Sequence, residues 1–449
     1  MGGQGTFQIF LFSLTVLTVS RIHAHLGLGA LRPALLLVAG AFGYALLNPK
    51  VVSWEALFRY WPTKVMAGLA VVACLSAAFG ISLGATAVFI LSEYSKTLVL
   101  AALLIAAFRG AAQVRLMVFA YVIGAAILVY YALFVFALSG GNGGMMRLSN
   151  LYTYDANDLG LMLLVAVPLA LWLMGTVRRR GKVLISALLL SIGAALALSG
   201  SRGAFVGGAG LAIALLGFLR TVPFRKRLLV VGALGLGMAV MAPPGYWNQM
   251  STMLEPKDDY NWSSESGRRQ IWLRGLGYMA DYPVFGIGAG NFPRAEGMIS
   301  DIAMTQSADR GIKWLAAHNS FVQVGAEMGI VGLTLWSFLV FGGLVGMVRL
   351  RRRMPAGWAR GDPEQRFLYE STMYMPAAYV AFVVPAFFLS FAYMDPVYFL
   401  SALYCGVHAA VDRRLRRDRM MRSGSGFAPE LHHNGRAMRR TYVRNSRSA

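Results

Sequence analysis

Three side chains of this sequence have types that suit phosphate chemistry: Arg202, Arg268 and His318. Two guanidinium groups offer bidentate contacts to a pyrophosphate, and an imidazole with a pKa of about 6.5 can accept a proton from an attacking hydroxyl. Such a set suits displacement of a sugar from a lipid pyrophosphate. Because pyrophosphate is a good leaving group, arginines that stabilise its growing charge could replace both a metal ion and a general acid. We therefore expect no cofactor, no metal and no covalent nucleophile.

Each of these residues also has a purely structural interpretation. Arg202 lies in the short turn 199–204, which places it at a membrane boundary, where an arginine can simply extend toward lipid headgroups. His318 could be an imidazole at headgroup level that bonds to a backbone carbonyl. For the loop arginine, spacing alone does not choose between Arg268 and Arg269.

Three further residues are predicted to bind substrate. They are Arg269, Arg274 and Asn319. Arg274 is also typical of plain surface charge, as are Arg294, Arg310 and Lys313, although surface cations can attract a polyanion. Asp258 and Asp259 stand beside Lys257 and are interpreted as loop charge. The six histidines lack the spacing and carboxylate neighbours of a zinc site.

The elements that must position these residues are membrane helices. Of the 449 residues, 57% are hydrophobic and only 14% are charged, and the mean hydropathy is +0.55, which excludes an ordinary soluble domain. The start, MGGQGTF, lacks the basic region of a cleavable signal peptide, so the first apolar segment is expected to be a retained span. The two cysteines, both in apolar segments, exclude a disulfide framework.

With about 20 apolar residues per span as the guide, the sequence predicts an all-α polytopic membrane protein with about 12 transmembrane helices. The predicted spans are 7–20, 28–47, 66–84, 97–108, 114–138, 159–175, 183–199, 203–219, 228–243, 326–348, 372–393 and 396–411. The fourth is short, and the segment 83–91 before it could lie along the membrane interface. The membrane domain thus covers 1–411, and 412–449 is expected to be a basic, disordered cytoplasmic tail.

The net charge of +22 tests this topology. If the N-terminus is cytoplasmic, most Lys and Arg fall in cytoplasmic segments, as the positive-inside rule requires. Those segments are 48–64, 109–115, 176–182, 220–227, 349–371 and 412–449. We therefore interpret the charge as a topology signal, reject nucleic acid as a partner and expect both termini in the cytoplasm.

One extracytoplasmic loop is long, at about 244–317. It is expected to contain short helices, one of them capped by Ser264 or Ser266 and ended before Pro283. In that helix Arg268, Trp272, Leu276 and Met279 would form one stripe. The three glycines that follow, at 286, 288 and 290, predict a tight turn with exposed backbone. Small residues at two other sites predict close helix packing: Gly203 with Gly207, and Gly329 with Gly332.

The order of these patches resembles the O-antigen ligase/polymerase superfamily of bacterial envelope glycan enzymes. The resemblance covers about 150–345 and rests on Ser199–Ala204, on Ser266-Gly267-Arg268 with Ile271-Trp272 and Asp281–Phe292, on His318-Asn319 with Gly329 and Gly332, and on Asn157–Gly160. It implies a mostly helical fold with a large extracytoplasmic loop and a donor glycan carried on undecaprenyl pyrophosphate. It also implies that Arg202 and Arg268 are the essential arginines and His318 the base. Arg269 departs from the pattern, because a second arginine follows the first.

Two hypotheses of different classes follow. The first is a metal-independent glycosyltransferase that transfers or polymerises a lipid-linked glycan onto an acceptor hydroxyl of lipid A core, a growing polysaccharide or a protein. The second is a glycolipid flippase or small-solute transporter without chemistry, which the scarcity of charge inside the spans disfavours. Release of undecaprenyl pyrophosphate in vitro would separate them.

Overall fold

The chain is almost entirely helical in a computed structural model, which describes residues 3–137, 148, 150–151, 154–255, 262, 264, 266–306 and 314–424. Its N-terminal half contains α1 (Gly3–Ser20), α2 (Ile22–His25), α3 (Pro33–Leu47), α4 (Trp54–Arg59), α5 (Trp61–Phe79), α6 (Leu83–Phe89), α7 (Ser95–Ala107), α8 (Ala111–Tyr130), α9 (Ala156–Met174) and α10 (Arg179–Ser199). The remainder contains α11 (Arg202–Phe218), α12 (Phe224–Met241), α13 (Tyr246–Ser251), α15 (Arg268–Asp281), α16 (Phe292–Met298), α17 (Asp301–Gln306), α18 (Ser320–Leu350), α19 (Pro363–Ala386) and α20 (Asp395–Gly424). The antiparallel strands β1 (Asn150–Leu151) and β2 (Tyr154–Asp155) form a small ribbon, and single 3-10 or π turns complete the list: η1 (Leu28–Leu31), η2 (Pro49–Val51), η3 (Ile90–Tyr94), η4 (Tyr131–Ala137), η5 (Thr252–Leu254), η6 (Arg351–Arg353) and η7 (Ala356–Arg360).

Within these described residues, seven helices are long and apolar enough to cross a membrane, or eight if the bent pair of α12 with α13 and η5 forms one span. The expectation of an all-α polytopic membrane protein is therefore confirmed. The count of twelve stays a prediction, because several of the expected spans fall short of the length or hydropathy of a typical membrane helix.

The segment 83–91 does not lie along the interface as an element separate from the fourth span. Leu83–Ala107 is one continuous apolar helix of 25 residues, with a π-helical turn at Ile90–Tyr94. The helix continues because Leu83–Ala107 contains no proline and has its glycine, Gly84, in the first turn, and because Tyr94 is fully buried, with its hydroxyl 2.9 Å from that of Tyr398. Two charged residues of this helix, Glu93 and Lys96, form an ion pair on its surface.

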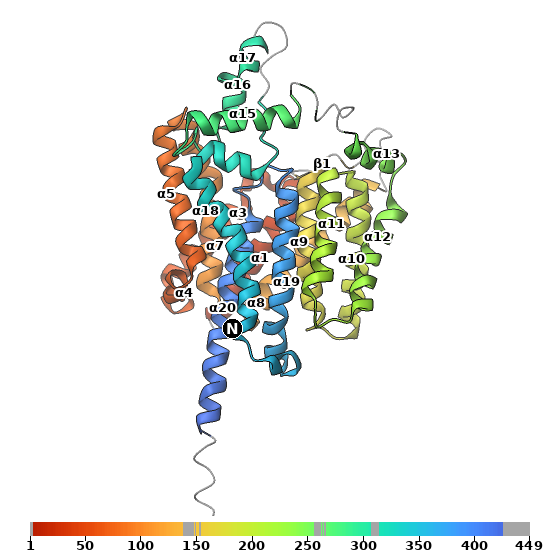
Figure 1. Cartoon of the computed structure of the whole chain (residues 1–449). Coiled ribbons are helices and arrows are strands. Elements are labelled where there is room, and N and C mark those ends of the chain that lie inside the picture. Colours follow the sequence, from red (N-terminus) through yellow and green to blue (C-terminus); the bar gives the residue numbers. More distant parts are fainter. Residues whose placement is uncertain are drawn as a thin grey trace, which may run out of the picture.

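The long helices run between two ends of the molecule, and different elements lie at each end. Figure 1 shows α13, α15, α16 and α17 at one end, with the ribbon β1–β2 below them. The N-terminus and the end of α20 lie together at the other. Helix α19 lies inside the bundle, packed against α9, α11 and α18. Because α11 and α18 both start at the α15 end, residues distant in the sequence meet there.

The C-terminal helix differs from the expected tail. Helix α20 passes residue 411 without a break and continues to Gly424, so 412–424 is ordered helix. It persists because Arg414, which is only 8% exposed, binds carboxylates of α19 and its N-cap. The remaining tail, 425–449, is outside the described residues.

Candidate functional site

His318 immediately precedes α18 and has an unusual backbone. Asn319 is the N-cap of the helix, and its side-chain oxygen accepts hydrogen bonds from the amides of Phe321 (2.9 Å) and Val322 (3.2 Å). His318 itself has a positive φ of 47°, a conformation that L-residues rarely adopt. Its amide donates to the hydroxyl of Ser390 at 2.9 Å, which helps to hold this conformation. Strain of this kind is concentrated at functional sites.

Helix α15 positions Arg268 beside this segment. The helix begins at Arg268 with Gly267 as its N-cap, so the expectation of a Ser264 or Ser266 cap is wrong. Gly267 is suited because any side chain there would collide with the carbonyls of Trp262 and Ser264. The expected end before Pro283 is confirmed, since the helix ends at Asp281.

The buried face of α15 also differs from the expected stripe by one position. It consists of Ile271, Gly275 and Tyr278, whereas Leu276 is half exposed. On the same helix, the indole nitrogen of Trp272 donates to the carbonyl of Ala317 at 3.1 Å. Because Ala317 precedes His318, this bond ties the first turn of α15 to the histidine segment.

A second attachment follows α15. The turn at 286, 288 and 290 has positive φ angles as expected, but its backbone is buried rather than exposed. The amides of Ile287 and Gly288 donate to the carbonyls of Ala326 (2.9 Å) and Glu327 (3.0 Å) in α18. The amide of Ile330 returns a bond to Pro283 O at 2.8 Å.

This docking requires a break in α18 at Gly329. The residue has φ 64° and ψ −167°, which kinks the helix, and a Cβ atom there would lie 2.2 Å from Val284 O. Gly329 therefore serves docking of the loop rather than simple packing of a straight helix. The partner Gly332 lies against Met328 of its own helix.

Arg202 is the first residue of α11, after a turn that is locked by its own hydroxyls. The Ser201 side chain caps the helix by accepting from the amide of Ala204 at 3.0 Å. The guanidinium Nε of Arg202 donates to Gln249 O at 3.2 Å, and the Gln249 side chain donates back to Gly200 O at 3.0 Å. The bent pair of α12 and α13 thus supports Arg202 from the loop side. The expected packing at Gly203 and Gly207 is confirmed, since Cβ atoms there would contact Phe388 and Pro385.

The connector between α19 and α20, residues 387–394, joins the two halves of the site. Phe388 lies against Gly203, beside Arg202. The next residue, Leu389, accepts a bond from Ser320 Oγ at 2.8 Å, and Ser390 holds the His318 amide. The sequence prediction missed this connector because it assigned 372–393 to a membrane span. A cavity of about 350 Å³ adjoins it, lined in part by Ser390, Gln323, Arg21, Lys96 and Asp395.

Electrostatics link His318 to two charged residues. Burial lowers the pKa of His318 below its ordinary value, and the positive charge of Arg268 lowers it further, while Asp155 acts in the opposite direction. Arg268 and Asp155 therefore each lie close enough to His318 for their charges to act on it. Asp155 caps α9 by accepting from the amides of Asn157 (2.7 Å) and Asp158 (2.8 Å). The sequence analysis did not single out Asp155, although it noted the Asn157–Gly160 patch that follows this residue.

The other predicted substrate-binding residues have different environments. Arg269 is exposed. Arg274 is mostly buried, with its guanidinium bound to the carboxylate of Glu296, whose side chain is 1% exposed, so it is not the plain surface charge that was considered. The Asn319 oxygen is occupied by the helix cap. Binding of substrate by any of the three stays a prediction, and Arg310, Lys313 and Asp258-Asp259 lie outside the described residues.

The fold is that of an all-helical membrane protein, with Arg202, Arg268 and His318 toward one end. Residues 187–337 match the family model described as O-Antigen ligase, and this range includes Arg202, Arg268 and His318. The match supports the O-antigen ligase/polymerase superfamily, as the sequence motifs indicated. It covers a narrower range than the 150–345 expected. A search of curated proteins finds no match to the chain.

Proposed function

We propose that the chain is a metal-independent glycosyltransferase at the outer face of a bacterial inner membrane. It transfers or polymerises a glycan from undecaprenyl pyrophosphate onto an acceptor hydroxyl of lipid A core, a growing polysaccharide or a protein. The observation that carries this proposal is the arrangement around His318: its backbone has a positive φ, and the pKa of its partly buried imidazole is lowered by burial and by Arg268. The family match supports the reaction class.

In the proposed reaction, the acceptor oxygen attacks the anomeric carbon of the donor sugar. His318 takes the hydroxyl proton, and the bond from the anomeric carbon to the pyrophosphate oxygen breaks. Arg202 and Arg268 stabilise the negative charge that grows on the departing pyrophosphate. A lowered pKa keeps His318 neutral near pH 7, as a base must be. The proton then leaves to water, which restores the site.

The geometry supports this assignment of roles. Arg202 and His318 come from α11 and from the segment before α18, and both of these elements contact the connector 387–394. On the proposed orientation, the opposite end of the molecule, with both termini, faces the cytoplasm.

The test is turnover of the purified full chain with lipid-linked glycan and an acceptor. His318→Ala should lower the release of undecaprenyl pyrophosphate by about 10²- to 10⁴-fold, the usual contribution of a general base. Arg202→Ala should lower it by about 10²-fold or more. Normal turnover in both variants, with the protein still inserted, would refute the proposal.

A matched pair of variants then tests the loop arginine. Arg268→Ala should behave like Arg202→Ala, whereas the exposed neighbour Arg269→Ala should keep most of its activity. If only Arg269→Ala loses activity, the role assigned to Arg268 is wrong. If wild-type protein binds the glycolipid but releases no pyrophosphate with any acceptor, a flippase becomes the better explanation.

A further inference from the structure

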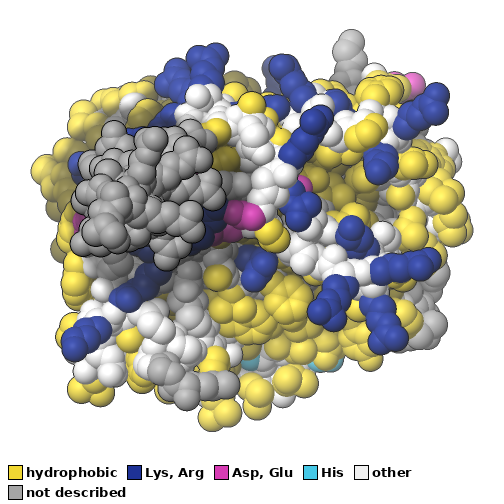
Figure 2. All heavy atoms as spheres, turned by 90° about the horizontal axis from the view of Figure 1, so that it is seen from below, with side chains coloured by type: hydrophobic (Ala, Val, Ile, Leu, Met, Phe, Trp, Pro, Cys, Tyr) yellow, Lys and Arg dark blue, Asp and Glu magenta, His cyan; other side chains and the backbone are white. Residues whose placement is uncertain are grey.

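A basic groove lies at the end of the molecule opposite His318. Figure 2 shows this end, where Lys and Arg side chains are spread over the surface and few carboxylates are visible. Between the ends of α11 and α18, beside α19, is a cavity of about 480 Å³. It is lined by Phe218, Arg220, Val348, Arg351, Arg352 and Thr372. These residues define the groove considered below.

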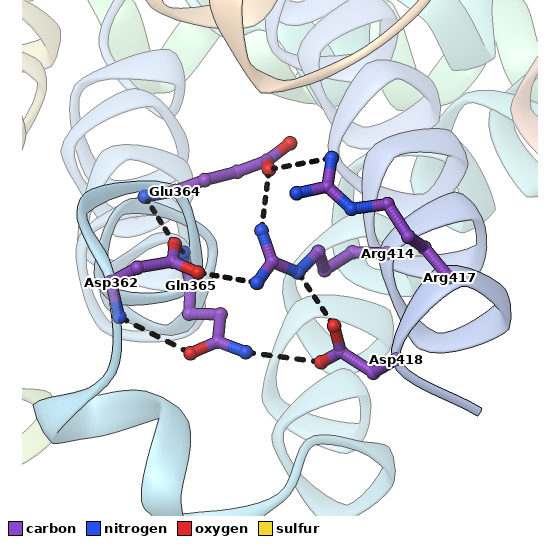
Figure 3. A network of polar contacts seen from close by, with 6 residues as sticks. All are labelled: Asp362, Glu364, Gln365, Arg414, Arg417 and Asp418. Atoms are coloured by element: carbon purple, nitrogen blue, oxygen red, sulfur yellow. Dashed lines mark hydrogen bonds and ion pairs between the residues drawn. The ribbon is translucent and has the colours of Figure 1, made fainter. Parts of the chain in front are cut away.

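Several carboxylates of this end already form ion pairs with other arginines. Figure 3 shows Arg414 of α20 between Asp362 and Glu364 at the start of α19 and Asp418 on its own helix. A further acid, Asp412, binds Arg353 at 2.8 Å and Arg59 at 3.2 Å. These acidic groups therefore already form ion pairs with arginines that do not line the groove.

The three groove arginines have no such partner. Among the described residues, no carboxylate forms an ion pair with Arg220, Arg351 or Arg352. Arg220 donates weakly to Gly217 O at 3.4 Å, and the guanidinium of Arg351 lies 5.4 Å from the ring centre of Tyr369. These contacts orient the side chains without neutralising them. Three converging positive charges thus remain around one cavity.

The groove also has an apolar side. Phe218 ends α11, and Val348, which is 42% exposed, is the last large apolar residue of α18 to face outward before the basic cluster. The arginines follow directly in the chain, so the groove crosses from lipid-facing helix surface to the polar boundary. A free phosphate ion would use only the basic half. A phospholipid would use both, with its phosphate on the arginines and its glycerol and upper acyl chains on Phe218 and Val348.

We propose that this groove binds the headgroup of an anionic phospholipid from the membrane leaflet on the same side as the end of α20. Arg352 and Arg220 contact the phosphate from two helix ends, and Arg351 adds positive charge from the same turn as Arg352. The inference is independent of the proposed glycosyl transfer, because α11 and α18 carry the candidate catalytic residues at their other ends. Loss of one site therefore need not affect the other.

The test is native mass spectrometry of the purified full chain titrated with dioleoyl phosphatidylglycerol or, for comparison, dioleoyl phosphatidylcholine. We expect the first phosphatidylglycerol to bind at least about tenfold more tightly than phosphatidylcholine. The triple variant Arg220→Gln, Arg351→Gln, Arg352→Gln should lose that preference. If the triple variant does not fold, the single variant Arg352→Gln, at an exposed position, should weaken binding about threefold or more.

A matched control separates the groove from general surface charge. The variant Arg178→Gln, Arg179→Gln, Arg180→Gln removes three exposed charges beside α10, away from the groove lining, and should bind within about twofold of wild type. Equal losses in the two triple variants would overturn the proposal. So would equal affinity of wild type for the two lipids, or displacement of phosphatidylglycerol by inorganic phosphate at the same concentration.

Discussion

Gly329→Ala should uncouple Arg268 from His318 without touching either residue. The kink at Gly329 lets the segment 283–288 bond to the backbone of α18, and that segment directly follows α15, which carries Arg268. If the segment leaves α18, the position of α15 relative to His318 rests mainly on the Trp272 bond to Ala317. A single methyl group therefore tests how the site is assembled.

The size of the effect follows from the local geometry. Alanine at φ 64°, ψ −167° occupies a region almost restricted to glycine, which costs about 1–3 kcal/mol. Its Cβ would lie 2.2 Å from Val284 O, so the segment must retreat by roughly 1 Å to reach ordinary contact. That movement breaks the 2.8 Å bond from Ile330 N to Pro283 O, worth about 1 kcal/mol. The total of about 2–4 kcal/mol raises the undocked population roughly 30- to 700-fold.

Hydrogen exchange measures the undocking directly. The amides of Ile287 and Gly288 should lose protection in Gly329→Ala, and transfer activity should fall with them. Gly235→Ala in α12 is the matched control, because its Cβ would meet no atom within 4 Å and alanine favours a helix. The control should keep wild-type exchange and activity.

The reasoning would be refuted by a Gly329→Ala protein that retains wild-type protection at 287–288. It would be refuted in part by a variant that loses protection but keeps full turnover. In that case the docked segment stabilises the loop, and Arg268 either finds its position by another route or is not needed.

Three further predictions concern charged groups. In Arg268→Gln, the acid limb of the pH–rate profile should move to higher pH. Removing the positive neighbour raises the lowered pKa of His318, and the histidine acts as a base only when it is deprotonated. An acid limb that stays in place would contradict the coupling between the two residues. Arg274→Ala should lower the free energy of unfolding by about 3 kcal/mol, measured by thermal melts, because it leaves the buried carboxylate of Glu296 without its cation. Replacing both residues by apolar ones should restore much of the loss. Arg414→Ala should cost less, about 1–2 kcal/mol, because its carboxylate partners are partly exposed; a loss equal to that of Arg274→Ala would contradict this ranking.

The sequence was sufficient for features that depend on local composition. Apolar segment length was sufficient to predict a polytopic helical membrane protein, and Pro283 marked the end of α15, because both signals act within a few residues. It left open whether 83–91 lies along the interface, because the predicted fourth span, 97–108, was short, whereas the structure joins both segments in one apolar helix, Leu83–Ala107.

Features that depend on distant backbone contacts were not predictable. The turn at 286–290 was expected to be exposed because glycines usually signal a surface loop, yet its amides bond to α18 some forty residues later. The connector 387–394 was hidden inside a hydrophobic stretch, since Phe387, Phe388 and Leu389 read as membrane helix. Only Asp395 marked its end. Its role in contacting both Gly203 and His318 follows from the fold alone.

The choice between Arg268 and Arg269, which spacing left open, follows from the packed face of α15. Arg268 shares the helical stripe of Ile271, Gly275 and Tyr278, at separations of three, four and three residues, and that stripe is buried. Arg269 lies one residue later, which rotates its side chain by about 100° around the helix axis and away from that face, and it is exposed. The pKa of His318 responds to Arg268, as this geometry requires. The fold therefore favours Arg268 as the loop arginine of the proposed site, and the second arginine has the position of a solvated charge.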